Sequence, residues 1–172
     1  MPNRLYKLQP LIHAARLLED RLREELAPIG IGPRKARVMN VLHLMGSASQ
    51  AELVREFDIS AASMSTMTSR LIAGGFVQRT IDDDASGRVQ LSLTEMGAGL
   101  IDQIHEAWLR VDRVMEEAIG EGKAHELATL SGELRNAMGG EVAGAKAGYQ
   151  YYGGKTTDEP AEPQDVKMRR TR

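Results

Sequence analysis

The sequence predicts a mainly α-helical protein in which long helices at both ends enclose a smaller centre of short helices and one β-hairpin. Apolar residues recur at three- and four-residue spacing over residues 3–27, 94–119 and 123–138, which is the pattern of amphipathic helices. Between residues 76 and 93 apolar and polar residues alternate instead, which indicates two strands joined by a polar turn. This change of period separates the helical ends from a mixed α/β centre.

The first long helix is expected over residues 3–27. Its apolar stripe consists of Leu5, Leu8, Ile12, Ala15, Leu18, Leu22 and Leu26. The segment 27–32, with one proline and two glycines, breaks this helix. Pro33 suits the first position of a second helix, because an amide at that position would have no partner within the helix. The second helix is expected to reach Met45, and residues 46–48 are expected to form a turn.

Two short helices follow in the centre of the chain. Ser49 and Glu52 have the spacing of a capping box and predict a helix over the segment AELVREF. After a turn, Ser60 is expected to cap a helix over residues 61–73. Gly74-Gly75 ends that helix, because glycine readily adopts the left-handed conformation of a helix C-terminus.

The predicted hairpin comes next. One face of its first strand carries Val77, Arg79 and Ile81, and in the second strand Val89, Leu91 and Leu93 are expected to face inward. The turn between the strands contains Gly87. Beyond residue 140 the chain is rich in Gly, Ala, Pro and charge, and this tail is expected to be disordered.

Composition limits the function. The 172 residues include 22 basic and 24 acidic side chains, but residues 34–79 hold six basic and three acidic ones, a modest excess compatible with a DNA-binding face. The absence of cysteine excludes disulfides, cysteine-ligated zinc and thiol redox sensing. No apolar run approaches the roughly 18 residues of a membrane span, and no signal-peptide core follows the start. A cytoplasmic protein without membrane contact is therefore expected.

The order of helices and hairpin over residues 33–94 predicts a winged helix-turn-helix lobe. In this arrangement the second short helix enters a DNA major groove about 12 Å wide, and the hairpin reaches the neighbouring backbone. Residues 1–32 are expected to form an N-terminal dimerisation helix and linker, and residues 95–140 the C-terminal dimerisation helices, followed by the tail at 141–172. Long Leu- and Met-rich stripes need a partner, which predicts a homodimer.

Residues 58–94 resemble the recognition helix and wing of the MarR family of bacterial transcription regulators. The matching residues are Ile59-Ser60, Ser63-Met64-Ser65, Leu71, Gly75-Phe76-Val77, Arg79 and Leu91-Ser92-Leu93-Thr94. With the flanking helices, the resemblance covers about residues 5–140. It implies a dimer that binds a palindromic operator in double-stranded DNA, and a small aromatic or anionic effector between the dimerisation helices and the winged lobe.

The DNA-binding residues follow from the faces of the recognition helix. Met64, Met67 and Leu71 lie at helical spacing and are expected to be buried, which leaves small and hydroxyl-bearing residues outward. Hydroxyls bind phosphates or base edges, and methyl groups pack on thymine. For Ser63 and Thr66 we favour DNA contact over capping or solvation. The residues expected to contact DNA are Ser49, Ala61, Ala62, Ser63, Ser65, Thr66, Ser69, Arg70, Arg79, Asp84, Ser86 and Arg88.

The chain departs from the family in two places. Family members often carry Arg where Thr66 stands, so base recognition here is expected to depend on methyl contacts and DNA shape. The family's Asp-x-Arg pair in the wing is replaced by Asp84 and Arg88 with three residues between them. Arg88 is expected to reach the minor groove or a phosphate, with Asp84 restraining it, and a solvated turn charge is the alternative. Arg79 is expected to be structural or to contact phosphate.

The candidate effector-binding residues are His13 on the first helix, Arg37 and His43 on the second, and Met64 beneath the recognition helix. Arg37 could hold a carboxylate or phosphate by charge-assisted hydrogen bonds. A salt bridge between Arg37 and the long helices is an equally open alternative.

No pattern supports catalysis, a metal site or a cofactor. The four histidines lack ligand spacing, and Asp82-Asp83-Asp84 has no spaced glutamate. Neither a phosphate-binding loop nor a nucleophile elbow is present. The sequence predicts a dimeric repressor that a ligand releases from DNA. The alternative is a winged-helix protein-interaction module without DNA binding, and salt-dependent affinity for a palindromic fragment distinguishes the two.

Overall fold

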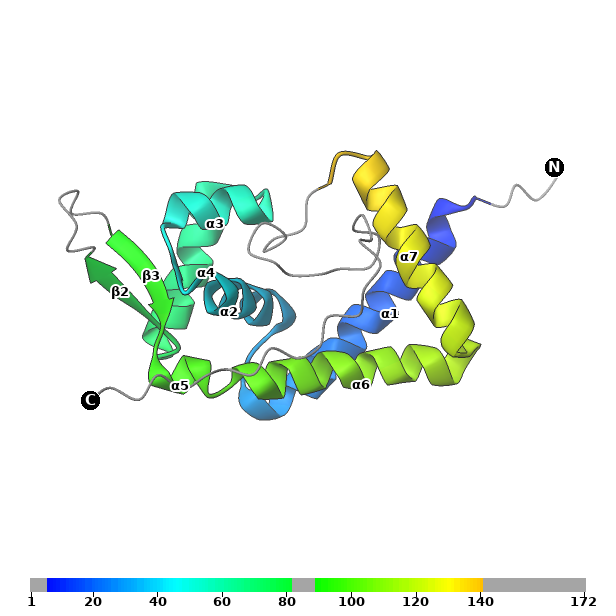
Figure 1. The fold of residues 1–172 in the computed structure, drawn as a ribbon, viewed down its shortest axis with the longest axis horizontal. Helices are drawn as coiled ribbons and strands as arrows, with labels where there is room; N and C mark the ends of the chain where they lie inside the picture. The colour runs from blue at the N-terminus through cyan, green and yellow to red at the C-terminus, as the bar shows by residue number, and fades with distance from the viewer. Residues whose placement is uncertain (1–5, 82–88, 141–172) are drawn as a thin grey trace, which may run out of the picture.

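The computed structural model describes residues 6–81 and 89–140. Its elements are α1 (Leu8–Leu26), η1 (Ala27–Ile29), α2 (Pro33–Met45), β1 (Ser47–Ala48), α3 (Gln50–Phe57), α4 (Ala61–Ala73), β2 (Val77–Ile81), β3 (Val89–Leu93), α5 (Glu95–Ala98), α6 (Ile101–Ile119) and α7 (Glu121–Ala137). Figure 1 shows α2, α3, α4 and the hairpin gathered at one end, and α1 and α7 at the other, with α6 extending along both. The mainly helical winged-helix fold is confirmed.

The winged lobe, residues 33–94, supplies most of the hydrophobic core, which Leu26 of α1 and Ile101 and Ile104 of α6 complete. Aliphatic residues from α2, α3, α4 and the sheet are at most 3% exposed: Val38, Met39, Val41, Leu42, Leu53, Met64, Leu71, Val77 and Leu91. The sheet is antiparallel in the order β1-β3-β2, with Ala48 opposite Leu91 and Val77 opposite Leu93. This packing fixes the hairpin against the end of α2.

The sequence signals at the helix ends are confirmed. The Ser49 Oγ accepts a hydrogen bond from the Glu52 amide at 3.2 Å, and the Glu52 carboxylate accepts one from the Ser49 amide at 2.7 Å. The Ser60 Oγ accepts from the Ser63 amide at 3.2 Å. At the other end of α4, Gly75 has a φ of 75°, which glycine adopts without strain. Capping therefore sets the starts of α3 and α4, and Gly75 follows the end of α4.

A close contact joins the lobe to the helices that follow it. The Thr94 Oγ1 donates to the Gly75 carbonyl at 2.6 Å and accepts from the Gly97 amide at 3.0 Å. A Cβ added at Gly97 would lie 2.0 Å from the Phe76 carbonyl oxygen, so only glycine fits there. These contacts hold α5 against the end of α4 and the start of β2.

The structure differs from the sequence prediction at three elements. The helix predicted over residues 94–119 is divided into α5 and α6 by a turn at Gly99-Leu100, because α5 must follow the lobe while α6 packs along α1. Residues 47–48, predicted as a turn, pair with β3 as β1. Val89 was expected to face inward but is 51% exposed, because the outer half of the hairpin extends beyond the lobe's core.

The remaining described helices leave much apolar surface uncovered. We refer to α1 and α7 as the helical arms. Their large apolar side chains with exposures between 36% and 79% are Leu8, Leu11, Ile12, Leu17, Leu127, Leu130 and Leu134, together with Met138 just after α7. On α7 these residues recur at intervals of three and four, so they share one face. In the described ranges, no helix is both long and apolar enough to span a membrane.

Candidate DNA-binding surface and ligand cavity

The outer face of α4 carries small and hydroxyl-bearing side chains. Ala61, Ala62, Ser63, Thr66, Ser69 and Arg70 are all exposed, whereas Met64 and Leu71 are fully buried and Met67 is half-buried. Thr68, which the sequence analysis did not single out, is also buried, and its hydroxyl donates to the Met64 carbonyl at 2.9 Å. The inner and outer faces expected from the helical period are therefore present.

Hydrogen bonds determine what each hydroxyl on this face can offer a ligand. The Thr66 Oγ1 donates to the Ala62 carbonyl at 3.0 Å, so its lone pairs and its methyl group are what it presents outward. The Ser60 hydroxyl donates to the Ser63 Oγ at 2.9 Å, which leaves the hydrogen of the Ser63 hydroxyl for another acceptor. Ser63 can thus donate to a phosphate or base, while Thr66 can accept or pack on a methyl group.

The other predicted DNA-binding residues occupy different positions. Arg79 is exposed on β2 next to α4, and Ser65 is half-buried. Ser49 is half-buried and engaged in its capping box. Asp84, Ser86 and Arg88 lie outside the described residues. The described part of the surface therefore consists of α4 and the base of the wing.

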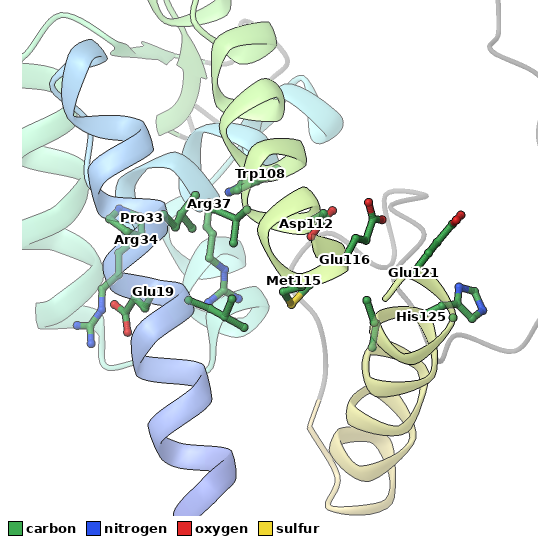
Figure 2. A pocket seen from close by; sticks show the side chains of 16 residues that line it. Glu19, Pro33, Arg34, Arg37, Trp108, Asp112, Met115, Glu116, Glu121 and His125 are labelled. Atoms are coloured by element: carbon green, nitrogen blue, oxygen red, sulfur yellow. The ribbon is translucent and has the colours of Figure 1, made fainter. Parts of the chain in front are cut away.

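A second feature is a cavity of about 1110 Å³ that is open to solvent between the winged lobe and the long helices. Its walls come from α1, α2, α6 and α7, as Figure 2 shows. The lining residues are Leu18, Glu19, Leu22, Pro33, Arg34, Arg37, Trp108, Val111, Asp112, Met115, Glu116, Glu121, Gly122, Ala124, His125 and Ala128. The cavity lies where the resemblance implied an effector site.

Of the four predicted effector residues, only Arg37 lines this cavity. Its guanidinium lies 5.6 Å from the centre of the Phe57 ring at the end of α3, within the range of a cation–π contact. Among the described residues no salt bridge of Arg37 to the long helices occurs. His13 is exposed on α1, His43 is exposed on α2, and Met64 is buried in the lobe's core.

The sequence analysis missed the wall formed by α6. Trp108, Asp112 and Glu116 are spaced by four residues, so they follow one face of that helix. Asp112 lies beside apolar lining residues, and burial raises the pKa of its carboxyl above the ordinary value. A lone tryptophan followed at helical spacing by two carboxylates was the available signal, because such a stripe is neither a core face nor an ordinary solvated face.

The junction between α2 and α6 holds a buried polar contact. Asn40 is 1% exposed, and its Oδ1 accepts a hydrogen bond from the His105 Nε2–H at 2.7 Å. The His105 ring also lies 5.5 Å from the Trp108 ring. Burial lowers the pKa of His105, and the nearby His43 lowers it further, while Asp102 acts in the opposite direction. The neutral imidazole is therefore the form that this junction favours.

The described residues contain no cluster of three or more histidine, aspartate or glutamate side chains that could bind a metal. A winged helix-turn-helix with an exposed α4 face and long flanking helices defines the class: a transcription regulator of the winged-helix type.

Comparisons with known proteins find relatives within this class. Residues 29–88 match the sequence profile of the MarR family. The Multiple antibiotic resistance protein MarR of Escherichia coli (strain K12) is 26% identical over 137 residues, which are 79% of this chain and 94% of that protein. Its counterpart in Salmonella typhimurium is 25% identical over 105 residues, 60% of this chain and 73% of that protein. Residues 29–88 therefore match the MarR family, and the chain is similar to members of that family over most of its length.

Solved structures share the fold. Wild-type MarR from E. coli, without ligand, has a TM-score of 0.63 at 22% identity and covers 78% of this chain and 99% of its own. A MarR mutant from E. coli complexed with operator DNA has a TM-score of 0.65 at 22% identity, covering 76% of this chain and 93% of its own. An organohalide sensing transcriptional regulator, RdhR, in the 2,4-dichlorophenol bound form, has a TM-score of 0.66 at 20% identity. It covers 80% of this chain and 88% of its own.

Proposed function

We propose that this protein is a homodimeric, sequence-specific DNA-binding repressor whose affinity for DNA falls when a small molecule occupies the cavity. The observation that carries the proposal is the outer face of α4, where every exposed side chain is small, hydroxyl-bearing or basic. Such a face permits close approach to a major groove and offers donors, acceptors and methyl groups. The relative with the same fold that was solved with operator DNA supports this role for the face.

The arms support a dimer. Leucines on one face of α7 and further apolar residues on α1 are exposed, and such groups of exposed apolar side chains mark interaction surfaces. A second copy of this chain covers such a surface by two-fold symmetry, since the same face occurs on both protomers. Two recognition helices related by that symmetry fit a palindromic operator with half-sites about one helical turn apart.

The position of the cavity supports ligand control. It is lined by α2 of the winged lobe and by α1, α6 and α7, so a ligand within it touches both parts of the protein. A ligand that binds more tightly to one orientation of the lobe shifts the population towards that orientation. If that orientation spaces the two recognition helices wrongly for the operator, the ligand releases the DNA.

The DNA-binding proposal is tested by anisotropy titrations of the full chain against a palindromic fragment from its own promoter region and against a scrambled fragment. We expect a preference for the palindrome and an affinity that falls steeply as salt is raised. Arg70→Ala is expected to weaken binding to both fragments and to reduce the salt slope by about one. Arg113→Ala, an exposed change on α6, is the control.

Equal affinity for the two fragments would favour the alternative, a winged-helix module that binds another protein. The dimer is tested separately by sedimentation. Leu130→Glu is expected to produce monomers, because it places a charge in the apolar face of α7, whereas Gln103→Glu on an exposed part of α6 is expected to leave the dimer intact.

A further inference from the structure

The cavity has walls of opposite charge that are held apart. On one wall, Arg34 and Arg37 lie in the first turns of α2, where the positive end of the helix dipole adds to their charge. On the opposite wall, α6 carries Asp112 and Glu116, and Figure 2 shows the two sets on different sides of the opening. Neither pair interacts with the other, since no ion pair within 4.0 Å joins them among the described residues. Glu19 of α1 lines the cavity on the side of the arginines, and its carboxylate pairs with Arg23.

Elsewhere in the molecule such side chains do pair. The Arg110 Nε lies 2.6 Å from the Glu25 Oε2 and links α6 to α1, and Arg21 lies 3.0 Å from the other oxygen of the same carboxylate. Two arginines and two carboxylates therefore form no ion pairs with each other, because the cavity separates them. These residues are Arg34, Arg37, Asp112 and Glu116. Within the described residues, Asp112 has neither a hydrogen bond nor a basic partner.

Apolar side chains also line the cavity. Leu22, Trp108 and Met115 are all half-buried and lie along the cavity. Trp108 offers a flat aromatic surface, and Met115 a flexible side chain that adapts to the shape of a ligand. Burial also raises the pKa of the Asp112 carboxyl, which is the effect of apolar neighbours without a compensating cation.

We infer that the cavity binds an elongated zwitterion with an apolar or aromatic body. Its anionic group would bind Arg34 and Arg37, its body would lie on Trp108 and Met115, and its amine would bind Asp112 and Glu116. This inference deepens the proposed ligand control and rests on it, because it specifies the chemical class of the effector.

The charge pattern favours a zwitterion over a simple aromatic acid. An aromatic acid binds the arginine wall but gives Asp112 and Glu116 no cation to bind. An aromatic amine binds the two carboxylates but gives Arg34 and Arg37 no anion to bind. Only a ligand with both charges forms charge-assisted hydrogen bonds at both ends.

A ligand of this kind would also tie the two parts of the protein together. Its anionic end is held by the winged lobe and its cationic end by α6, so occupancy adds a second link between α2 and α6 beside the Asn40–His105 hydrogen bond. Arg37 extends this effect towards the DNA-binding surface, because its guanidinium stacks on Phe57 at the end of α3. Engagement of Arg37 by the ligand competes with that contact.

The test uses the full chain and three probes of similar shape: 4-(4-aminobutyl)benzoate, 4-butylbenzoate and 4-phenylbutylamine. Binding is measured by the rise in Tm, since a ligand that binds only the folded protein raises it. We expect the zwitterion to bind at least about tenfold more tightly than either singly charged probe, which corresponds to a gain of one charge-assisted contact.

Two variants locate the charges. Arg37→Gln is expected to lower the affinity for the zwitterion to that of the amine, and Asp112→Asn to that of the benzoate. Each variant is compared with its own ligand-free Tm, and a cooperative unfolding transition shows that it is folded. Arg113→Gln, next to Asp112 in the sequence but not lining the cavity, is expected to leave all three affinities unchanged.

Equal binding of the three probes, binding of none, or an unchanged zwitterion affinity in both variants would overturn the inference. Operator affinity is measured on the same samples. Intact DNA binding without selectivity for the zwitterion rejects only the ligand class. Selective binding of the zwitterion without DNA binding rejects the proposed regulator and supports the ligand class.

Discussion

The helical arms are richer in leucine than the winged lobe, and the two regions use it differently. In the lobe, Leu42, Leu53 and Leu71 are fully buried in the hydrophobic core of the chain. In the arms, Leu17, Leu130 and Leu134 are between 50% and 70% exposed. The lobe therefore obtains its stability from contacts within one chain, whereas the arms leave their apolar faces uncovered in the single chain. The difference predicts that the two regions respond in different ways to the same kind of substitution.

The largest effect is expected from truncating a leucine in the lobe. Leu71→Ala should lower the free energy of unfolding by about 3 kcal/mol, because it leaves a cavity in a closely packed core. The matched change in an arm is Leu134→Ala. Because Leu134 is 50% exposed in the single chain, this change should lower the free energy of unfolding only of the dimer. Urea unfolding at two protein concentrations measures both effects. If the loss in Leu71→Ala depended on concentration as strongly as that in Leu134→Ala, the distinction between the regions would fail.

Much of the winged lobe could be predicted from the sequence, because the signals that mark its helices lie within a few residues of one another. Ser49 with Glu52, Ser60, and Gly75 mark helix ends by interactions within a few residues, so the helix-turn-helix could be located. Contacts between residues far apart in the sequence are harder to predict. The pairing of Ala48 with Leu91 depends on how the lobe folds back on itself, and two residues are too few to show a strand pattern.

The residues that line the cavity could be predicted only in part, for the same reason. Arg37 was predicted because a cation stands out on an apolar helix, but Asp112 belongs to a helix more than 70 positions further along the chain. Only the packing of α6 against α1 and α2 brings the two to one cavity. Met64 was placed correctly beneath the recognition helix, yet the core closes over it, which a helical period alone does not reveal.

The next largest effect is expected at the junction between the two regions. Gly97→Ala should lower the free energy of unfolding by about 2–3 kcal/mol, because its Cβ would lie 2.0 Å from the Phe76 carbonyl oxygen and the backbone must move. Gly99→Ala is the control, since the nearest atom to its Cβ lies at 3.5 Å. Thermal unfolding compares the two. A loss at position 97 no greater than at position 99 would mean that the contact does not constrain α5.

Within the lobe, two neighbouring hydroxyls should separate stability from DNA affinity. Ser60→Ala is expected to cost about 1 kcal/mol of stability, because it removes the cap of α4. Ser63→Ala should change stability by less than about 0.5 kcal/mol but weaken operator binding, because its hydroxyl is exposed on the outer face. Denaturant unfolding and anisotropy titration on both variants check the pair. The reverse pattern would assign DNA contact to Ser60 instead.

The smallest effect is expected from pH at the α2–α6 junction. The pKa of His105 is lower in the fold than its ordinary value of 6.5, so the unfolded chain binds a proton more readily. Stability from this group is therefore present above pH 6.5 and is lost as the pH falls towards the lowered pKa. His105→Gln keeps a donor for Asn40 and should make the fall of Tm between pH 7 and pH 5 shallower. His13→Gln, at an exposed position on α1, should leave that fall unchanged.

The exposed leucines of the arms have a consequence for how much of this protein a cell must contain. If two copies must meet before two recognition helices can face one operator, the amount of binding-competent protein rises with the square of the monomer concentration when the protein is scarce. Occupancy of the operator then responds more steeply to protein synthesis than it would for a monomer. The apolar face of α7 would thereby set a threshold of abundance below which the regulated promoter is free, before any ligand acts.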